Sequence, residues 1–157
     1  MTIRTESRIT IASSAGEVWA YVCDVGRWPE WAPTVLECRV RGGAELQPGS
    51  QVDQRAKDLW WTHNRSQEVT AVEAPRHVAF AGTMGASPAR WGMELQPADD
   101  GQTDAMMWIE VDLAGIMRVM PGLLKGRIQR VSDLEMASIK AAVEAEAEAA
   151  AREDAAS

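Results

Sequence analysis

Met120 to Asp154 read MPGLLKGRIQRVSDLEMASIKAAVEAEAEAAARED, which is one uninterrupted helical pattern. Pro121 suits the first turn of a helix, and no proline follows it. Beyond Val143 the pattern fades into Ala and Glu, so we expect one domain at 1–150 and a frayed tail at 151–157. At about 100° per residue, the helix would carry one broad apolar arc that must be buried, made of Leu124, Ile128, Val131, Leu134, Ile139 and Ala142.

Seven segments of the remaining chain alternate in the manner of β-strands. From Ile3 to Ile11, apolar or small residues at odd positions alternate with charged or polar residues. Strands joined by tight turns pair as an antiparallel sheet, and a curved sheet around one helix leaves space for a cavity. Six more strands are predicted, at 34–43, 50–58, 59–75, 76–83, 89–97 and 103–115.

Two short helices are expected between the first two strands. A serine before residue 15 and Glu17 form a capping box for the first helix. The second helix lies in DVGRWPEWAP (24–33), with Pro29 in its first turn. Trp28 and Trp31 are three residues apart and share one face of this helix. They serve either as buried anchors beneath the long helix or as ligand contacts at the cavity mouth.

Composition argues against several classes of function. A net charge of −7 over 157 residues disfavours nucleic acid as a partner. No apolar run approaches the length of a membrane span, and the N-terminus lacks an apolar signal-peptide core, so we expect a cytoplasmic protein. Cys23 and Cys38 are expected to be reduced thiols. The two histidines, His63 and His77, lack metal-ligand spacing, so neither a metal nor another cofactor is expected.

Five segments that extend over nearly the whole chain carry a resemblance to a known family: ITIASSAGEVW (9–19), DVGRWPEW (24–31), LQPGS (46–50), VTAVEAPRHVAF (69–80) and DLEMASIK (133–140). They resemble the START-like superfamily, in particular polyketide cyclase/dehydrase-type (SRPBCC) proteins. The resemblance implies an α+β helix-grip fold, in which a seven-stranded curved antiparallel sheet wraps around a long C-terminal helix. It also implies an internal cavity for a hydrophobic small molecule.

The strand predicted at 59–75 carries polar residues on its expected inner face, where Trp61, His63, Arg65 and Gln67 alternate with more polar neighbours. An inward arginine needs a carboxylate or a ligand oxygen, because an unpaired buried charge is costly. In aromatase/cyclase-type relatives an arginine on this strand is taken to polarise a carbonyl, and the resemblance implies that role for Arg65. A register shifted by one residue would place these polar side chains in solvent instead.

Two carboxylates could face the cavity. Glu135 falls within the apolar arc of the long helix, where it would pair with Arg65 or act as a general base with a raised pKa. Alternatively, it reaches out to solvent at the rim. On the strand at 103–115, Glu110 faces inward only if Met106 and Trp108 do, and the opposite register is favoured because its residues are uniformly apolar.

A mostly aromatic and apolar set of side chains is expected to contact the ligand, with plain core packing as the alternative. His63 joins Arg65 and Glu135 as a predicted catalytic residue, able to move protons. The predicted ligand contacts are Trp28, Trp31, Trp61, Gln67, Phe80, Trp91, Met93, Trp108, Val131 and Ser138.

Two functions fit these predictions. The first is a polyketide cyclase/dehydratase-like enzyme that promotes aldol closure and dehydration of a poly-ketone chain. The second is a non-catalytic carrier or sensor of a lipid-like or aromatic molecule. The carrier is favoured by a departure from the family pattern, since aromatase-type relatives often carry a tyrosine soon after W-P-x-W, and the only tyrosine here is Tyr21. A third reading is an interaction module for another macromolecule, and a homodimer is left open.

Overall fold

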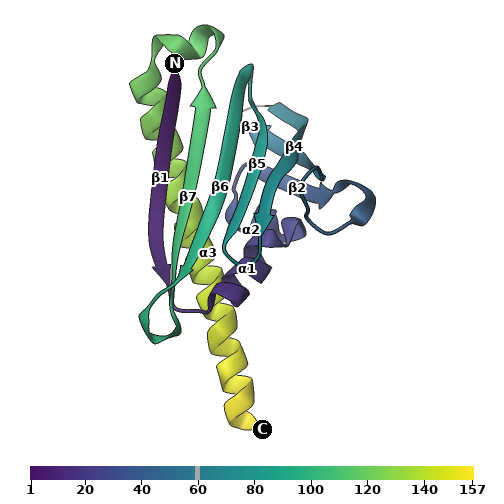
Figure 1. Ribbon diagram of the computed structural model, residues 1–157, viewed down its shortest axis with the longest axis vertical. Coiled ribbons are helices and arrows are strands. Elements are labelled where there is room, and N and C mark those ends of the chain that lie inside the picture. The colour runs from purple at the N-terminus through teal and green to yellow at the C-terminus, as the bar shows by residue number, and fades with distance from the viewer. Residues whose placement is uncertain (59–60) are drawn as a thin grey trace.

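A seven-stranded antiparallel sheet curves around one long helix in the computed structural model, which describes residues 1–58 and 61–157 (Figure 1). The sheet order is β1-β7-β6-β5-β4-β3-β2, so each strand pairs with its neighbour in sequence except at β1, which pairs with β7. The predicted fold class is confirmed. The strands are β1 (Thr2–Ile11), β2 (Val35–Val40), β3 (Gln51–Asp58), β4 (Trp61–Glu73), β5 (His77–Met84), β6 (Ser87–Pro97) and β7 (Thr103–Asp112).

All seven predicted strands are present. Residues 59 and 60, the first two of the strand predicted at 59–75, lie outside the described part of the chain. On β1, odd-numbered residues are buried or partly buried and even-numbered residues are exposed, which is the predicted alternation. β7 pairs with β1 and likewise turns its odd-numbered residues inward. Along β1 and β7, the concave face therefore carries mostly apolar or small side chains, and the convex face carries the charged ones.

The helices between β1 and β2 also match their predictions. α1 (Ala15–Cys23) begins at a capping box in which Ser14 and Glu17 satisfy each other's backbone groups. A 3-10 turn, η1 (Val25–Arg27), leads into α2 (Trp28–Trp31), which holds Pro29 in its first turn. Three further 3-10 turns lie in the loops: η2 (Arg41–Gly43), η3 (Asp99–Gly101) and η4 (Gly115–Val119).

The long helix α3 (Pro121–Ala156) packs along β1 and over the concave face of the sheet (Figure 1). Its buried face is rotated from the predicted arc, because Leu134 is 65% exposed whereas Met136 is buried. Relative to the arc predicted from apolar residues alone, the face that meets the sheet is therefore turned toward residues one or two positions later in the sequence. Its buried residues are Ile128, Ser132, Met136, Ile139 and Val143.

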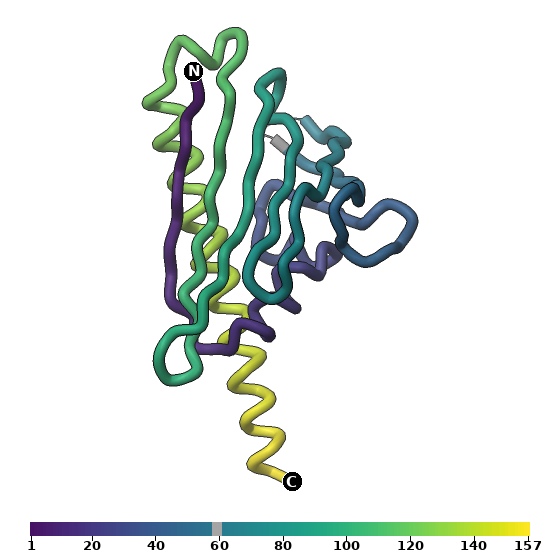
Figure 2. The backbone as a smooth tube through the Cα atoms, in the orientation of Figure 1, coloured from purple at the N-terminus to yellow at the C-terminus, as the bar shows by residue number. Residues whose placement is uncertain are grey.

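The C-terminal part of α3 differs from the sequence prediction. The apolar pattern fades beyond Val143 and a frayed tail was expected at 151–157, whereas the helix continues to Ala156 and projects past the sheet (Figure 2). Alanine and glutamate have high helix propensity, and Arg152 pairs with Glu148 one turn before it at 3.7 Å. Glu144 accepts from the backbone N–H of Ala12 and Glu146 pairs with Arg27, and local propensity continues the helix beyond these contacts.

The two tryptophans of α2 anchor it to the core. Trp28 and Trp31 are 1% and 3% exposed, and the indole N–H of Trp28 donates to the carbonyl of Val22 at 2.8 Å. The ring of Trp28 meets those of Phe80 and Trp91 edge-on, with centroids 5.3 Å away in both cases. The anchoring role considered from the sequence is therefore what the packing shows. Among the described helices, none combines the length and apolarity that crossing a bilayer requires.

Candidate functional site

A cavity of about 700 Å³ lies between the concave face of the sheet and α3. Its walls come from β3 to β7 on one side and from the N-terminal half of α3 on the other, with α2 closing part of the floor. Trp28, Trp31 and Val131 line it, as predicted, and the tryptophans do so while being almost fully buried. Such a volume is in the range that small-molecule sites occupy.

The strand β4 turns its polar row inward. Gln67 and Val69 are buried, His63 and Arg65 are partly buried, and all but Val69 of these line the cavity. The intervening residues of β4 are exposed up to Thr70. Of the two registers left open by the sequence, the inward one is confirmed.

Arg65 is held by a neighbour that the sequence analysis did not identify. Its Nε donates to Oε1 of Gln54 at 2.7 Å, and Gln54 lies directly opposite Arg65 in the pairing of β3 with β4. Gln54 is 4% exposed and also lines the cavity. A signal for it existed, because Val52 and Ala56 flank it two residues away on either side and mark the inner face of β3.

Glu135 reaches the same cavity from α3. Burial raises the pKa of its carboxyl group to about 7, and the positive charge of Arg65 opposes that shift without cancelling it. The carboxyl therefore exists in both protonation states near neutral pH, which is what a group that accepts and returns a proton needs. Arg65 and Glu135 thus occupy facing walls of one cavity, which is one of the two placements that the sequence left open for each of them.

An aromatic wall stands beside this pair. The indole N–H of Trp91 donates to Oε1 of Gln67, which fixes the ring against the cavity. Trp91 stacks on Phe80 with centroids 4.4 Å apart and planes tilted by 14°. Phe80 and Met93, predicted as ligand contacts, are each 1% exposed and do not line the cavity, so they belong to the core around Trp91.

Three other predicted ligand contacts are placed elsewhere. Trp61 is the first described residue of β4 and is 72% exposed, so it does not line the cavity. Trp108 is on the convex face because the odd-numbered residues of β7 face inward, and the guanidinium of Arg4 lies 5.2 Å from its ring. Ser138 is exposed on α3 and donates to the carbonyl of Leu134 at 3.0 Å.

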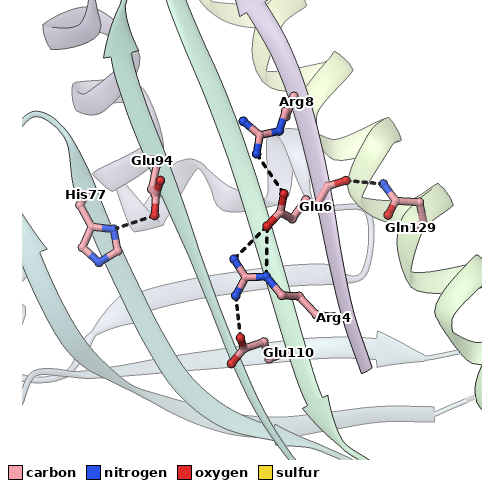
Figure 3. A network of polar contacts seen from close by, with 7 residues as sticks. All are labelled: Arg4, Glu6, Arg8, His77, Glu94, Glu110 and Gln129. Carbon is pink, nitrogen blue, oxygen red and sulfur yellow. Dashed lines mark hydrogen bonds and ion pairs between the residues drawn. The ribbon is translucent and has the colours of Figure 1, made fainter. Parts of the chain in front are cut away.

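The favoured register of β7 is confirmed by the position of Glu110. Met107 and Ile109 line the cavity, whereas Glu110 is on the convex face. Its carboxylate accepts from Arg4 at 2.6 Å, within the network of charged side chains drawn in Figure 3. It also lies 3.2 Å from the guanidinium of Arg90. Glu110 is therefore a surface group and not part of the site.

The cavity has an uneven charge balance. Glu135 is the one acidic residue among the described residues that line it, whereas Lys57, Arg65, Arg90 and Arg127 are basic. Apolar residues from β7 and α3 cover much of the remaining wall. This arrangement suits an apolar molecule that carries carbonyl, enolate or carboxylate oxygens. Within residues 1–58 and 61–157, no three His, Cys, Asp or Glu side chains are grouped as a metal site would require.

The fold and the cavity define a helix-grip protein built to enclose a hydrophobic small molecule. A family model described as "Polyketide cyclase / dehydrase and lipid transport" matches residues 2–144, and the chain belongs to this family, which confirms the resemblance seen in the sequence. A comparison with curated proteins finds no match.

Solved structures share the fold at low sequence identity. The di-domain ARO/CYC StfQ of the steffimycin biosynthetic pathway is 13% identical with a TM-score of 0.74, and the match covers 94% of this chain and 52% of that one. This chain therefore spans about half the length of StfQ. Ara h 8.0201 is 13% identical (TM-score 0.70; 91% and 98% covered). A norcoclaurine synthase mutant from Thalictrum, solved with a transition-state analogue, is 12% identical (TM-score 0.67; 91% and 94% covered).

Proposed function

We propose that the protein is a cyclase/dehydratase that closes a ring in a poly-ketone chain and removes water from the product. The observation that carries the proposal is the placement of Arg65 and Glu135 on facing walls of one largely apolar cavity. Two similar structures bear the names of enzymes, ARO/CYC and norcoclaurine synthase, so this fold is compatible with catalysis. Membership of the cyclase/dehydrase family supports the choice of reaction.

In the first step, the carboxylate of Glu135 takes a proton from a carbon between two carbonyl groups. The electron pair of that C–H bond moves onto a carbonyl oxygen, which becomes an enolate. The guanidinium of Arg65 stabilises this oxygen, and because its Nε is bonded to Gln54, its terminal nitrogens would face the ligand. A donor that is fixed before the reaction stabilises developing charge without reorganising.

In the second step, the enolate carbon attacks another carbonyl carbon of the same chain, and a C–C bond forms. The new alkoxide takes the proton that Glu135 holds, either directly or through His63, which passes one proton on and receives one in return, so Glu135 is again a carboxylate; His63 lies two residues nearer the start of β4. Glu135 then takes a further α-proton and gives it to the hydroxyl group, which leaves as water as the C=C bond forms. Each proton that Glu135 takes up is returned, so the protein ends the cycle unchanged.

The apolar walls contribute by holding the chain in a folded conformation. A poly-ketone can close into several rings, and the ring that forms depends on which carbons are brought together. Trp91 presents a flat surface that is fixed by Gln67 and Phe80, so it restricts the conformations that fit beside Arg65. Orientation of this kind supplies several powers of ten in rate.

The test is a product profile from a minimal polyketide synthase, measured with wild-type protein, with variants and with no protein. We expect a new cyclised and dehydrated product with wild type, and its rate to fall by roughly 10²–10³ in Arg65→Ala and by 10²–10⁴ in Glu135→Gln. Arg55→Ala on the outer face of β3 and Glu148→Gln on the exposed end of α3 are matched controls. A profile unchanged by the wild-type protein contradicts the cyclase proposal.

A carrier or sensor is the second candidate function. It is favoured by the single acidic residue in the described lining and by the three cations besides Arg65, which are Lys57, Arg90 and Arg127. A cavity with several basic groups retains an acid such as a fatty acid or a phenolate without transforming it. This candidate gains if an apolar acid binds the wild-type protein, binds more weakly to Arg65→Ala, and is recovered unchanged.

A further inference from the structure

One segment of this acidic chain carries basic charges only. Residues 113–132, which run from the end of β7 through η4 into α3, contain four basic side chains and no acidic one. The whole chain has a net charge of −7, so the remainder is more acidic still. The four cations are Arg118, Lys125, Arg127 and Arg130.

The same segment carries a cluster of exposed apolar side chains, which we call the mouth patch. The described chain exposes eight large apolar residues, and four of them lie within the eight positions 116–123. Single exposed apolar residues are ordinary, whereas a concentration of them marks an interaction surface. The members of the mouth patch are Ile116 (87% exposed), Val119 (74%), Met120 (55%) and Leu123 (60%).

The mouth patch lies beside residues that line one end of the cavity. Leu124, which directly follows it, lines the cavity, and so do Met84 and Gly85 in the turn between β5 and β6. The hydroxyl of Ser87 donates to the sulfur of Met117 (3.2 Å) and accepts from the backbone N–H of Ala114 (3.0 Å). These two hydrogen bonds tie the η4 region to this turn. A molecule that enters or leaves the cavity at this end therefore passes beside the mouth patch.

We propose that the mouth patch docks the protein on the surface of a lipid bilayer that contains anionic lipids. Clustered apolar side chains that project from a turn and a first helical turn enter the interfacial region of a bilayer, and flanking cations attract anionic headgroups. A protein partner fits less well. A stable protein–protein interface buries about 800 Å² of complementary surface on each side, whereas the mouth patch consists of four side chains. The docked mouth would let an apolar ligand move between bilayer and cavity.

The charges elsewhere favour one orientation on such a surface. The acidic C-terminal end of α3, with Glu146, Glu148, Glu153 and Asp154, lies at the opposite end of the molecule from η4 (Figure 1). An anionic surface repels this end and attracts the mouth segment. The proposal concerns docking, and it holds whether the cavity transforms its ligand or only carries it.

The test is sedimentation of the full chain with vesicles of phosphatidylcholine alone and with about one third phosphatidylglycerol. We expect binding to the anionic vesicles that weakens as salt is raised. Arg118→Gln with Lys125→Gln should lower the partition coefficient by about fivefold per charge, and Ile116→Ser with Val119→Ser by roughly tenfold or more.

Matched controls use equally exposed residues far from the mouth. Leu134→Ser (65% exposed) and Arg152→Gln (82% exposed side chain) should bind vesicles as wild type does, and thermal melts should show every variant to be folded. Arg65→Ala should also bind vesicles normally, which separates a failure of docking from a failure of the cyclase proposal.

Three outcomes would overturn the docking proposal. One is equal or absent binding to the two kinds of vesicle. Another is a loss of binding in the controls as large as in the mouth variants. The third is a wild-type dimer, seen by light scattering, that Ile116→Ser with Val119→Ser converts to a monomer, since the patch would then be an interface between two copies of this chain.

Discussion

The two faces of the sheet carry the same kinds of charged side chain in opposite surroundings. On the convex face, Arg4 lies between Glu6 and Glu110, with side chains that are 24–44% exposed (Figure 3). On the concave face, Arg65 shares a cavity with Glu135. Water and several cations surround the outer carboxylates, whereas the inner carboxylate has lost most of its water.

The difference is visible in the direction of the pKa shifts. Hydrogen bonds from Arg4 and Arg8 lower the pKa of Glu6, so it remains ionised. Burial raises the pKa of Glu135 to about 7 despite the nearby charge of Arg65. Both carboxylates have an arginine nearby, so an arginine does not by itself identify a reactive pair. The two carboxylates differ in their degree of desolvation, and this difference sets the direction of the pKa shift.

The largest difference in stability is expected between an inner and an outer tryptophan. Trp28→Ala removes a ring that is 1% exposed and touches Phe80 and Trp91, so the free energy of unfolding should fall by about 3–5 kcal/mol. Trp61→Ala should change it by less than about 0.5 kcal/mol, because Trp61 is 72% exposed. Urea titrations of both variants measure the difference, and equal losses would show that the inner wall is not part of the core.

The next largest effect concerns the pH dependence of stability. The pKa of Glu135 is raised in the folded state, so its contribution to stability is fully present below the unfolded pKa of about 4.5 and is lost as the pH rises through 7. Glu135→Gln removes this loss. The variant should therefore be more stable than wild type at pH 8, by at most about 3 kcal/mol, and the gain should vanish near pH 4.5.

Glu6→Gln is the matched outer variant. The pKa of Glu6 is lowered, so its contribution is present above the unfolded pKa and disappears as the pH falls. The substitution should lower stability slightly at pH 8 and leave it unchanged in acid. Denaturant titrations at pH 4.5, 6 and 8 compare the two variants, and the same sign of change at pH 8 would contradict the contrast between the faces.

Two glycines of neighbouring strands give a smaller, steric contrast. A Cβ added at Gly92 would lie 2.6 Å from the Trp108 ring and 2.7 Å from the carbonyl oxygen of Val78, so Gly92→Ala should cost about 1–3 kcal/mol. A Cβ at Gly82 would meet Gln67 Cγ at 3.2 Å, where a flexible side chain beside the cavity has room to move. Gly82→Ala should therefore affect ligand binding more than the melting temperature. The prediction fails if Gly82→Ala unfolds at a lower temperature than Gly92→Ala.

The smallest effect is expected from the outer ion pairs. Arg4→Ala removes contacts with Glu6 and Glu110 and the approach to Trp108, yet exposed pairs contribute less than about 1 kcal/mol. The loss should shrink further in high salt. Melting curves at low and high salt measure it. A loss that matched Trp28→Ala would mean that the convex face carries much of the stability.

Alternation and helical periodicity were sufficient to predict the elements and their order, and the family resemblance implied the helix-grip arrangement. They located seven strands, two short helices and the long helix, because each element has a marked face and clear turn or capping residues. For Arg65 and Glu135 they offered an inward and an outward placement, and the structure has the inward one for both. The end of α3 was missed because helix propensity alone maintains it, and no pattern of burial marks it.

The misplaced site residues have local causes. Trp108 was included because aromatic residues suit a ligand, although the apolar row of β7 already indicated that it faces outward. Trp61 is on the inner row of β4 but is its first residue, where the inner side of the strand is exposed. The sequence does not show at which residue the inner side of a curved sheet becomes exposed. Val52 and Ala56 already indicated that Gln54 faces inward, but its position opposite Arg65 follows only from the pairing of β3 with β4.

The most direct measurement is a titration of the glutamate carboxyl carbons by NMR, with Glu135 and Glu6 assigned through their glutamine variants. We expect Glu135 to titrate near pH 7 and Glu6 below 4.5, and Arg65→Ala to move the Glu135 midpoint higher because a favourable positive charge is removed. A Glu135 midpoint near 4.5 that does not respond to Arg65→Ala would contradict the contrast between the two faces and the role proposed for this pair.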